Sequence, residues 1–286
     1  MSKNKKIDNI FVIGLGLIGA SLCRSLKKSN AYKNIYGYDK NKEASKIASQ
    51  ERYIDKSMEK ILDGVEKSDL IIFCVPLSEI ENCLHQSNSF FNTEKIFTDT
   101  LSAKAKIIKY FLDNELNDIS NFIYSHPMAG TENFGIKNFK KDLFTGSTAL
   151  ICPMKNSSDE SIDSVKKLWK LAGCKISEIE IDFHDEMLAA VSHIPHLISF
   201  SLSKKIHDLN FEEKYSWVYE KGSLSDMLRI SRSDPVAWAN IFLSNKKNIS
   251  KFINEYIEEL KLLDSNIDSE NIDNLVSLLK KPNSNN

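Results

Sequence analysis

A strand-like apolar run near the start of the chain leads directly into closely spaced glycines. Residues 10–13 are apolar, residues 14–19 read GLGLIG, and residues 20–26 continue with a helical pattern. The first glycine would permit a tight turn, the second would let the backbone approach phosphates, and the third would let strand and helix pack closely. The helix N-terminus would face an anion. We therefore expect a dinucleotide site here, with a glycine turn that binds nothing as the alternative. The residues assigned to it are Gly14, Gly16, Leu17, Ile18 and Gly19.

An acidic residue, Asp39, stands twenty residues after the last of these glycines and directly follows the apolar run 35–38. A carboxylate in this position can accept hydrogen bonds from both hydroxyls of an adenosine ribose, and it would repel a 2'-phosphate. Lys40 follows and could soften that preference. The pattern favours NAD over NADP as the cofactor.

Several chemically useful residues follow other strand-like runs. Ligands of open α/β sheets bind beyond the carboxyl ends of the strands. Val75 and Pro76 close the run that starts at residue 70, and we expect them to border the cofactor. His126 follows the run 122–124, and Pro127 favours extended backbone at this histidine. An imidazole titrates near neutrality and can act as a base, although a packing role is the alternative.

Two histidines, His193 and His196, are spaced to lie on one face of a helix, with Pro195 as an expected kink between them. Either could be a core histidine satisfied by the backbone. A zinc site that also used His184 would lack a cysteine or a second HxxH pair, so we expect no metal.

Arginine is rare in this chain, since 34 of the 38 basic residues are lysine. Two of the four arginines, Arg229 and Arg232, fall within four residues of each other. A guanidinium can hold a carboxylate in two parallel hydrogen bonds, which the point charge of lysine cannot do. An anion site is therefore predicted here, and solvated cations at a helix end are the alternative.

The composition is that of an ordinary globular protein. The chain has 286 residues, of which 42% are hydrophobic and 27% charged, and its formal charge is −1. No apolar run approaches the roughly 18 residues of a membrane span, and no overall charge favours nucleic acid. Five widely spaced cysteines without a CxxC pair indicate reduced thiols and a cytoplasmic protein.

The first part of the chain alternates apolar runs with helical patterns, which is typical of βαβ units around a parallel sheet. Strands are expected at 10–13, 35–38, 70–75, 96–98, 122–124, 149–152 and 175–181, and helices near 17–29, 41–50, 77–87, 102–116 and 166–172, with Gly173 as a C-cap. After Asp182 only helical periodicity remains, at 183–207, 211–221, 223–231, 235–263 and 270–280. The predicted fold is α/β, with an N-terminal Rossmann dinucleotide-binding domain (residues 1–182) followed by an all-α substrate and dimerisation domain (residues 183–286).

The segment 235–263 carries one continuous apolar stripe at spacings of three and four residues. A single helix of this length would run roughly 40 Å. Stripes that long often cross a subunit boundary, and we expect a homodimer formed through the helical domain.

Four sequence segments together resemble the prephenate dehydrogenase family: DTLSAK at 99–104, SHPMAGTE at 125–132, AVSHIPH at 190–196 and RISRSDP at 229–235. The resemblance extends over nearly the whole chain. It implies an NAD-dependent oxidative decarboxylation of prephenate to 4-hydroxyphenylpyruvate in tyrosine biosynthesis. Arogenate (cyclohexadienyl) dehydrogenases share the pattern, and the sequence does not separate the two substrates.

The resemblance also implies roles for individual residues. His126 would be the catalytic base, and Ser102 would hydrogen-bond the reacting hydroxyl and the nicotinamide. Arg229 would bind a substrate carboxylate, with His196 contacting the substrate. The residues expected to line the pocket or its mouth are Ser192, His193, Thr131 and Glu132, the last of which could instead be a surface charge.

Two rival hypotheses remain open from the sequence. The first is another NAD(P)-dependent dehydrogenase of the β-hydroxyacid type, which usually relies on a catalytic lysine in the helical domain. The second is a cofactor-binding sensor without activity, which would not need a titratable base beside the nicotinamide. Ser225 and residues 222–226 depart from the family pattern and leave the substrate side-chain preference open, as does the unassigned role of Arg232.

Overall fold

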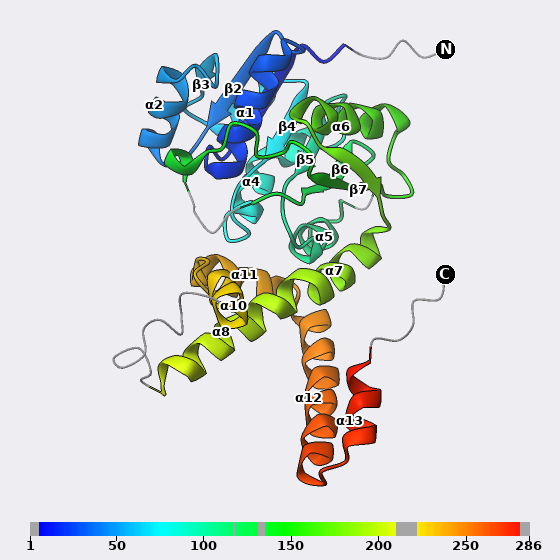
Figure 1. Ribbon diagram of the computed structural model, residues 1–286. Coiled ribbons are helices and arrows are strands. Elements are labelled where there is room, and N and C mark those ends of the chain that lie inside the picture. Colours follow the sequence, from blue (N-terminus) through cyan, green and yellow to red (C-terminus); the bar gives the residue numbers. More distant parts are fainter. Residues whose placement is uncertain (1–5, 117, 131–134, 210–221, 281–286) are drawn as a thin grey trace.

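The computed structural model describes residues 6–116, 118–130, 135–209 and 222–280 (Figure 1). An α/β half, formed by the first part of the chain, lies above a helical half formed by the second (Figure 1). The predicted fold class is confirmed. Strand β8 ends at Glu178 and helix α7 begins at Ile181, close to the expected boundary, although the division into domains at residue 182 stays a prediction.

Eight strands of the described chain form one sheet in the order β3-β2-β1-β4-β5-β6-β7-β8. They are β1 (Asn9–Ile13), β2 (Asn34–Tyr38), β3 (Lys56–Ser57), β4 (Leu70–Phe73), β5 (Ile96–Asp99), β6 (Phe122–Pro127), β7 (Thr148–Cys152) and β8 (Lys175–Glu178). Strand order reverses between β1 and β4, and this reversal is where open α/β sheets bind nucleotides.

Two strands depart from the expected parallel sheet, because β7 runs antiparallel to β6 and β8 runs in the same direction as β7. The segment between β6 and β7 contains a short 3₁₀ turn, Ile136–Asn138, and no crossover helix among its described residues. A parallel return normally needs such a crossover, whereas an antiparallel one does not. The two-residue strand β3 was also not expected, because it is too short for an apolar pattern.

Helices cover both faces of the sheet. They are α1 (Leu17–Ser29), α2 (Lys42–Gln50), α3 (Ile61–Lys67), α4 (Ile80–Ser87), α5 (Ala105–Asp113) and α6 (Asp159–Ala172), with a 3₁₀ turn at Asn88–Phe90. Residues of α1, α2 and α6 share one buried core, and those of α3, α4 and α5 share the other. Helix α3 was missed by the sequence analysis. Gly173 caps α6 with a φ of 105°, as predicted.

The helical half starts with a nearly continuous rod that contains one irregular turn. The rod consists of α7 (Ile181–Leu188), a π-helical segment (Ala189–His193) and α8 (Ile194–His207). The other described helices of this half are α10 (Ser223–Ser231), α11 (Pro235–Ser244), α12 (Lys246–Asp268) and α13 (Ile272–Leu279). Pro195 lies in the first turn of α8, so the irregularity precedes the proline instead of following from a kink inside a helix. The helix expected at 211–221 lies outside the described residues.

The single long helix expected at 235–263 is wrong. Asn245 breaks it into α11 and α12, with a φ of −106° and a ψ of 26°. Its side chain is buried and donates a hydrogen bond to the backbone oxygen of Asp185, 2.6 Å away. This tertiary contact overrides the local periodicity.

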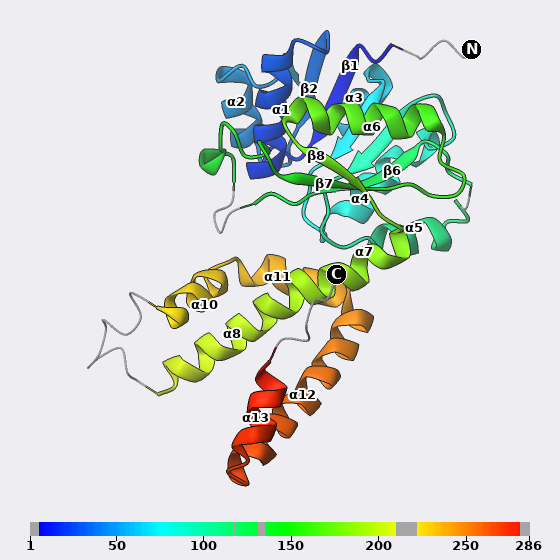
Figure 2. The ribbon, with the colours of Figure 1, turned by 45° about the vertical axis from the view of Figure 1, so that its right-hand side comes forward.

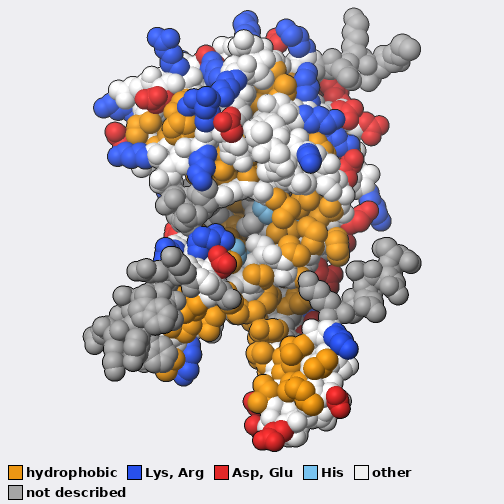
Figure 3. Space-filling view, in the orientation of Figure 1, with side chains coloured by type: hydrophobic (Ala, Val, Ile, Leu, Met, Phe, Trp, Pro, Cys, Tyr) orange, Lys and Arg blue, Asp and Glu red, His pale blue; other side chains and the backbone are white. Residues whose placement is uncertain are grey.

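Helices α12 and α13 lie side by side and project away from the α/β half as an arm (Figure 2). Large apolar side chains on this arm are exposed, among them Ile267, Ile272 and Leu279. Figure 3 shows hydrophobic surface spread along the arm. Across the described chain, none of the helices combines the length and the hydropathy that crossing a bilayer requires.

Candidate active site

The glycine loop after β1 is shaped by close backbone contacts. Gly14 has a φ of 95°, and a Cβ there would lie 2.4 Å from the carbonyl oxygen of Cys74. A Cβ on Gly19 would lie 1.9 Å from the carbonyl oxygen of Gly14. Side chains essentially cannot occupy either place, so these two glycines are required by the packing of the protein itself.

Gly16 behaves differently, because a Cβ built on it would meet no protein atom within 4 Å. It is the N-cap of α1, and no acidic residue occupies the first turn of that helix, which starts with Leu17 and Ile18. The helix N-terminus therefore offers backbone N–H groups and a partial positive charge to open space. This cradle fits a pyrophosphate, which needs the backbone to approach closely.

Asp39 directly follows β2 and belongs to the same corner of the sheet. One carboxylate oxygen accepts a hydrogen bond from the backbone N–H of Leu15 at 2.7 Å, and the other accepts one from Asn41 at 2.8 Å. These two contacts fix the carboxylate beside the glycine loop. A carboxylate accepts more than two hydrogen bonds, so capacity remains for ribose hydroxyls.

Val75 and Pro76 lie just past β4, which ends at Phe73 instead of at residue 75 as expected. A Cβ on Gly14 would come 3.0 Å from a methyl group of Val75, so this side chain borders the glycine loop. Pro76 is exposed. Both residues thus lie at the point where the strand order reverses.

His126 lies inside β6, which continues through Pro127 instead of ending at residue 124. The register of β5 and β6 carries His126 beyond the last residue of β5. The neighbouring Ser125 anchors the strand: its hydroxyl donates to the backbone oxygen of Asp99 at 2.6 Å and accepts from the indole N–H of Trp169 at 2.9 Å. Packing and hydrogen bonds therefore hold His126 at the carboxyl edge of the sheet.

A buried ion pair organises the loop that carries Ser102. Lys104 and Asp99 pair with both side chains fully buried, and the ammonium group also donates to the backbone oxygens of Leu101 and Ser125 at 2.8 and 2.7 Å. A buried charge needs this degree of pairing to be tolerated. Ser102 lies half-buried between Leu101 and the lysine, so the ion pair fixes the backbone on both sides of the predicted catalytic serine.

His126 is held neutral at pH 7. Its side chain is buried, and its pKa lies well below the ordinary 6.5, first because of burial and then because of the positive charge of Lys104 and the neighbouring His184 and His193. A neutral imidazole can accept a proton, whereas a protonated one cannot. The environment therefore keeps the ring in its proton-accepting form, and the same lowered pKa makes it a weaker base than a free imidazole.

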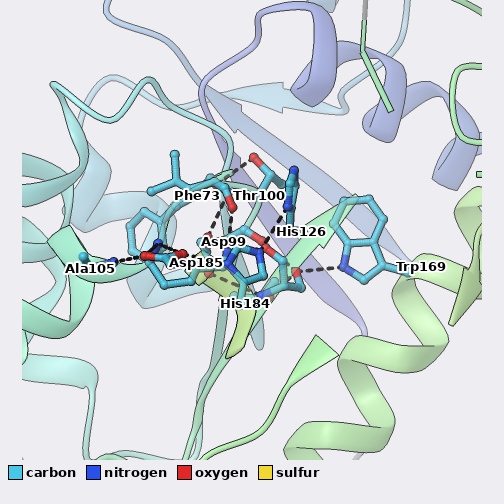
Figure 4. A network of polar contacts seen from close by, with 12 residues as sticks. Phe73, Asp99, Thr100, Ala105, His126, Trp169, His184 and Asp185 are labelled. Carbon is cyan, nitrogen blue, oxygen red and sulfur yellow. Dashed lines mark hydrogen bonds and ion pairs between the residues drawn. The ribbon is translucent and has the colours of Figure 1, made fainter. Parts of the chain in front are cut away.

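Two adjacent residues of α7 lie behind this histidine: His184 contacts His126, and Asp185 contacts His184 (Figure 4). Nδ1 of His126 lies 3.2 Å from Nε2 of His184, and Nδ1 of His184 lies 2.7 Å from Oδ1 of Asp185. The carboxylate of Asp185 also accepts the backbone N–H groups of Lys104 and Ala105, at the start of α5. The sequence analysis considered His184 only as a weak zinc ligand and did not single out Asp185.

His193 lies in the π-helical segment and is fully buried. Burial lowers its pKa to about 4, although Asp185 opposes the shift. The amide nitrogen of Asn245 lies 3.1 Å from its Nδ1 and can only donate there, so the neutral ring carries its proton on Nε2. That Nε2–H forms no close hydrogen bond among the described residues, and the Ser102 backbone is the polar group that acts on the ring from this side.

His196 lies one turn further along, in α8. Its Nδ1 donates to the backbone oxygen of Ser192 at 2.9 Å, which fixes the orientation of the ring. The ring stacks on Trp238 of α11, with the centroids 3.6 Å apart and the planes 18° from parallel. Burial lowers the pKa of His196, the Ser192 carbonyl opposes that shift, and the positive charge of Arg229 adds to it, so this arginine lies nearby on α10.

The predicted residues thus fall into three groups, two at one sheet edge and one on the helical half. The cofactor residues surround the β1–α1 loop, and His126, Ser102 and His193 are linked to one another through α7. Arg229 and His196 form a further group on the helical half, with Arg229 exposed. In Figure 3, histidine side chains are visible in the hollow between the two halves. Thr131 and Glu132 lie outside the described residues, and the roles assigned to all these side chains stay predictions.

Four contributors to the site escaped the sequence analysis: Asp185, Asn245, Trp238 and the Asp99–Lys104 pair. The first three act through contacts between segments distant in the sequence, and the ion pair reaches a distant strand through the Ser125 carbonyl. Trp238 lies within the segment 235–263, where the sequence indicates only an apolar stripe. Within the described ranges, no three histidine, cysteine or acidic side chains come together in a way that could hold a metal ion.

Comparison with known proteins agrees with this arrangement along the whole chain. The family model for the nucleotide-binding domain of prephenate dehydrogenase matches residues 22–178, and that for its dimerization domain matches residues 181–281. The prephenate dehydrogenase of Bacillus subtilis is 29% identical over 97% of this chain and 75% of its own length. The cyclohexadienyl dehydrogenase of Zymomonas mobilis is 30% identical over 96% of this chain and 93% of its own length.

Solved structures give the same result. The prephenate dehydrogenase of Aquifex aeolicus, crystallised with hydroxyphenyl propionate and NAD+, superposes with a TM-score of 0.86 at 29% identity and covers 97% of this chain and 96% of its own. The Synechocystis arogenate dehydrogenase has the same fold, with a TM-score of 0.78 at 24% identity over 95% of this chain and 96% of its own.

The nucleotide cradle, the neutral histidine at the same sheet edge and the matching nucleotide-binding domain define an NAD-dependent dehydrogenase. The family models account for most of the chain. It therefore belongs to the prephenate dehydrogenase family.

Proposed function

We propose that this enzyme oxidises prephenate to 4-hydroxyphenylpyruvate and carbon dioxide, a reaction of tyrosine biosynthesis. When bound, NAD accepts the hydride from the ring carbon that carries the hydroxyl. His126 accepts the hydroxyl proton. Loss of the ring carboxylate as carbon dioxide then supplies the electron pair that makes the ring aromatic, and the proton returns to the oxygen as a phenol. The observation that carries this proposal is the buried, neutral His126 on the sheet edge that also holds the glycine cradle.

Ser102 and His193 would orient the reactants around this base. The Ser102 backbone is held between the Asp99–Lys104 pair and the ring of His193. Its hydroxyl would hydrogen-bond the reacting alcohol, while His193, which acts on the Ser102 backbone, would line the pocket or the nicotinamide side. Both would contribute by positioning, which lowers the barrier through orientation.

Arg229 and His196 would hold the substrate from the helical half, with Ser192 lining the pocket. Prephenate carries two carboxylates, and an exposed guanidinium can bind one of them with two parallel hydrogen bonds. His196 is fixed between the Ser192 carbonyl and the Trp238 ring, so it can present Nε2 to the side chain of the substrate. Thr131 and Glu132 are proposed for the mouth of the pocket on resemblance alone.

The test is the rate of NADH formation by the purified enzyme with prephenate and with arogenate, each with NAD and with NADP. We expect the highest kcat/KM with prephenate and NAD. Turnover of arogenate alone would overturn the prephenate assignment. Binding of NAD without turnover of either compound would favour a cofactor sensor.

Arogenate is the second candidate substrate, because a relative that aligns over 96% of this chain is named cyclohexadienyl dehydrogenase. Prephenate and arogenate differ only in a keto or an amino group on the side chain, far from the reacting carbon. The His126 and Ser102 chemistry would serve both.

A homodimer through the helical half is proposed on two grounds. The match over residues 181–281 is to a dimerization domain. The α12–α13 arm also exposes apolar side chains such as Leu279 and Ile272, which a partner subunit would cover. We expect light scattering to give twice the chain mass of 32.6 kDa, and a monomer would contradict the proposal.

A cytoplasmic location is proposed from the need for NAD and from five cysteines that are all free. We expect no partner among nucleic acids or membranes. Cell fractionation would test this location.

A further inference from the structure

The geometry points to a pair of positioning residues behind the base: we propose that His184 and Asp185 hold the proton of His126 on Nδ1 and thereby leave its Nε2 free to accept a proton. The catalytic meaning of this arrangement rests on the proposed function. The proton positions themselves do not, because they follow from the contacts of α7 with the α/β half.

The argument starts at Asp185. Its two carboxylate oxygens accept the backbone N–H of Lys104 at 2.9 and 3.0 Å, and Oδ2 also accepts that of Ala105 at 3.0 Å. Burial raises the pKa of Asp185, but His184 and these backbone donors outweigh it and hold the pKa below its ordinary value. The carboxylate is therefore ionised and has no proton to donate. Since Oδ1 lies 2.7 Å from Nδ1 of His184, that nitrogen must be the donor.

The next step follows from the chemistry of imidazole. A neutral ring carries one N–H, so Nε2 of His184 accepts when Nδ1 donates. Burial keeps His184 neutral by lowering its pKa, against the opposing effect of Asp185. Nε2 of His184 lies 3.2 Å from Nδ1 of His126, which must therefore donate. Nε2 of His126 is then left without a proton.

Other charged groups around His126 do not change this assignment. Lys104 approaches from the start of α5 and His193 from the π-helical segment, and both lower the pKa of His126. Asp99 on β5 pairs with Lys104. Among the described residues, His184 Nε2 is the partner that Nδ1 of His126 contacts. His126, His184 and Asp185 thus form a row of hydrogen-bonded side chains. Asp185, at the far end of this row, determines which nitrogen of each ring carries the proton.

A change of Asp185 to asparagine should reverse the direction of the hydrogen bonds along this row. The backbone N–H groups of Lys104 and Ala105 still need an acceptor, so the amide oxygen takes the place of Oδ2 and the amide NH₂ faces His184. Nδ1 of His184 then accepts, its Nε2 donates, and the proton of His126 moves to Nε2. Nε2 of His126 could then no longer accept a proton, although every ring stays in place.

The first measurement is ¹⁵N NMR of the histidine side chains, which is practical because the chain has six histidines. We expect His126, assigned by its loss in His126→Asn, to carry its proton on Nδ1 in the wild type and on Nε2 in Asp185→Asn. Asp182→Asn is the matched control, since Asp182 is exposed on the same helix. A wild-type proton on Nε2, or an unchanged tautomer in Asp185→Asn, would overturn the proposal.

The second measurement is steady-state kinetics. Asp185→Asn should lower kcat by about 10²- to 10⁴-fold, as expected when a base is held in the wrong tautomer, with the KM for NAD unchanged. His184→Gln keeps an amide oxygen able to accept from Nδ1 of His126, so it should retain at least about tenfold more activity than His184→Ala. Equal activities of these two variants would also count against the proposal.

The two proposals fail in different ways. If wild-type His126 carries its proton on Nδ1 but prephenate is not turned over, the substrate assignment is wrong and the row of protons stands. If prephenate is turned over but the proton sits on Nε2, the row is wrong and the function stands. If Asp185→Asn does not fold, the wild-type spectrum and the His184 pair decide.

Discussion

The cofactor corner and the substrate corner of this site are built in opposite ways. Around the glycine loop, Gly14, Gly19 and Asp39 are already engaged by neighbouring backbone atoms, so the shape is complete without a ligand. On the proposed substrate side, the guanidinium of Arg229 is exposed, and the structure shows no anion partner for it among the described residues. The difference suggests that packing determines cofactor recognition, whereas substrate recognition depends on groups whose partners the ligand supplies.

The largest expected effect concerns the residue between the two corners. His126→Asn should lower turnover at least about 100-fold, because loss of a general base costs about 10²- to 10⁴-fold. NAD binding should be unchanged, since the glycine loop does not depend on this side chain. Steady-state rates and an NAD titration measure both. His85→Asn, on an exposed turn of α4, is the control. If His126→Asn kept more than about a hundredth of wild-type turnover while binding both ligands, His126 would be excluded as the general base.

On the substrate side, Arg229→Lys should raise the KM for prephenate about 10- to 150-fold. A hydrogen bond to a charged group contributes about 1.5 to 3 kcal/mol, and lysine cannot reproduce the paired geometry. The KM for NAD should not change. Arg232→Lys, three residues away and also exposed, is the matched control. An unaltered KM in Arg229→Lys would remove this residue from the anion site.

On the cofactor side, Asp39→Ala should reduce the preference for NAD over NADP about tenfold or more, because the ribose loses an acceptor and the 2'-phosphate loses a repelling charge. The ratio of the two kcat/KM values measures the effect. Lys40→Ala tests whether the adjacent cation, paired with Glu79, softens the preference. Unchanged selectivity in Asp39→Ala would contradict the assignment.

The smallest expected effect is on stability and separates two glycines of the same loop. Gly16→Ala should change the unfolding free energy by less than about 1 kcal/mol, because its Cβ meets no protein atom, but it should weaken NAD binding. Gly19→Ala should destabilise the fold by several kcal/mol, because its Cβ would overlap the Gly14 carbonyl. Thermal unfolding and an NAD titration give both quantities. Similar stability losses in both variants would show that Gly16 too is required by packing.

Much of the α/β half could be predicted from the sequence because its strands are buried on both faces and therefore appear as short apolar runs. The run 70–75, which contains β4, is an example. The helix expected at 17–29 was also correct. The direction of β7 could not be predicted, since the apolar pattern of a strand is the same in both directions. The break at Asn245 was missed because the apolar stripe resumes at Ile249 in nearly the same phase.

The candidate site shows the same limit. Residues with a local pattern, such as the glycines and Asp39, could be singled out from the sequence, and His126 lies at the sheet edge that the sequence predicted. Asp185 acts on a backbone 81 residues away in the sequence, and His184 acts on a ring 58 residues away. No local spacing encodes such contacts. A signal was present in the adjacent His-Asp pair, but burial was needed to interpret it.

Asp185 belongs to the helical half, yet its carboxylate accepts hydrogen bonds from backbone N–H groups at the start of α5 in the other half. Swinging the two halves apart at this junction would strip a buried carboxylate of its donors and leave those N–H groups bare. These hydrogen bonds therefore hold the two halves together at the junction of α7 and α5. We therefore expect any opening for small molecules to involve α8 and α10, which pack against each other beyond the π-helical segment, while His126 keeps its contact with α7.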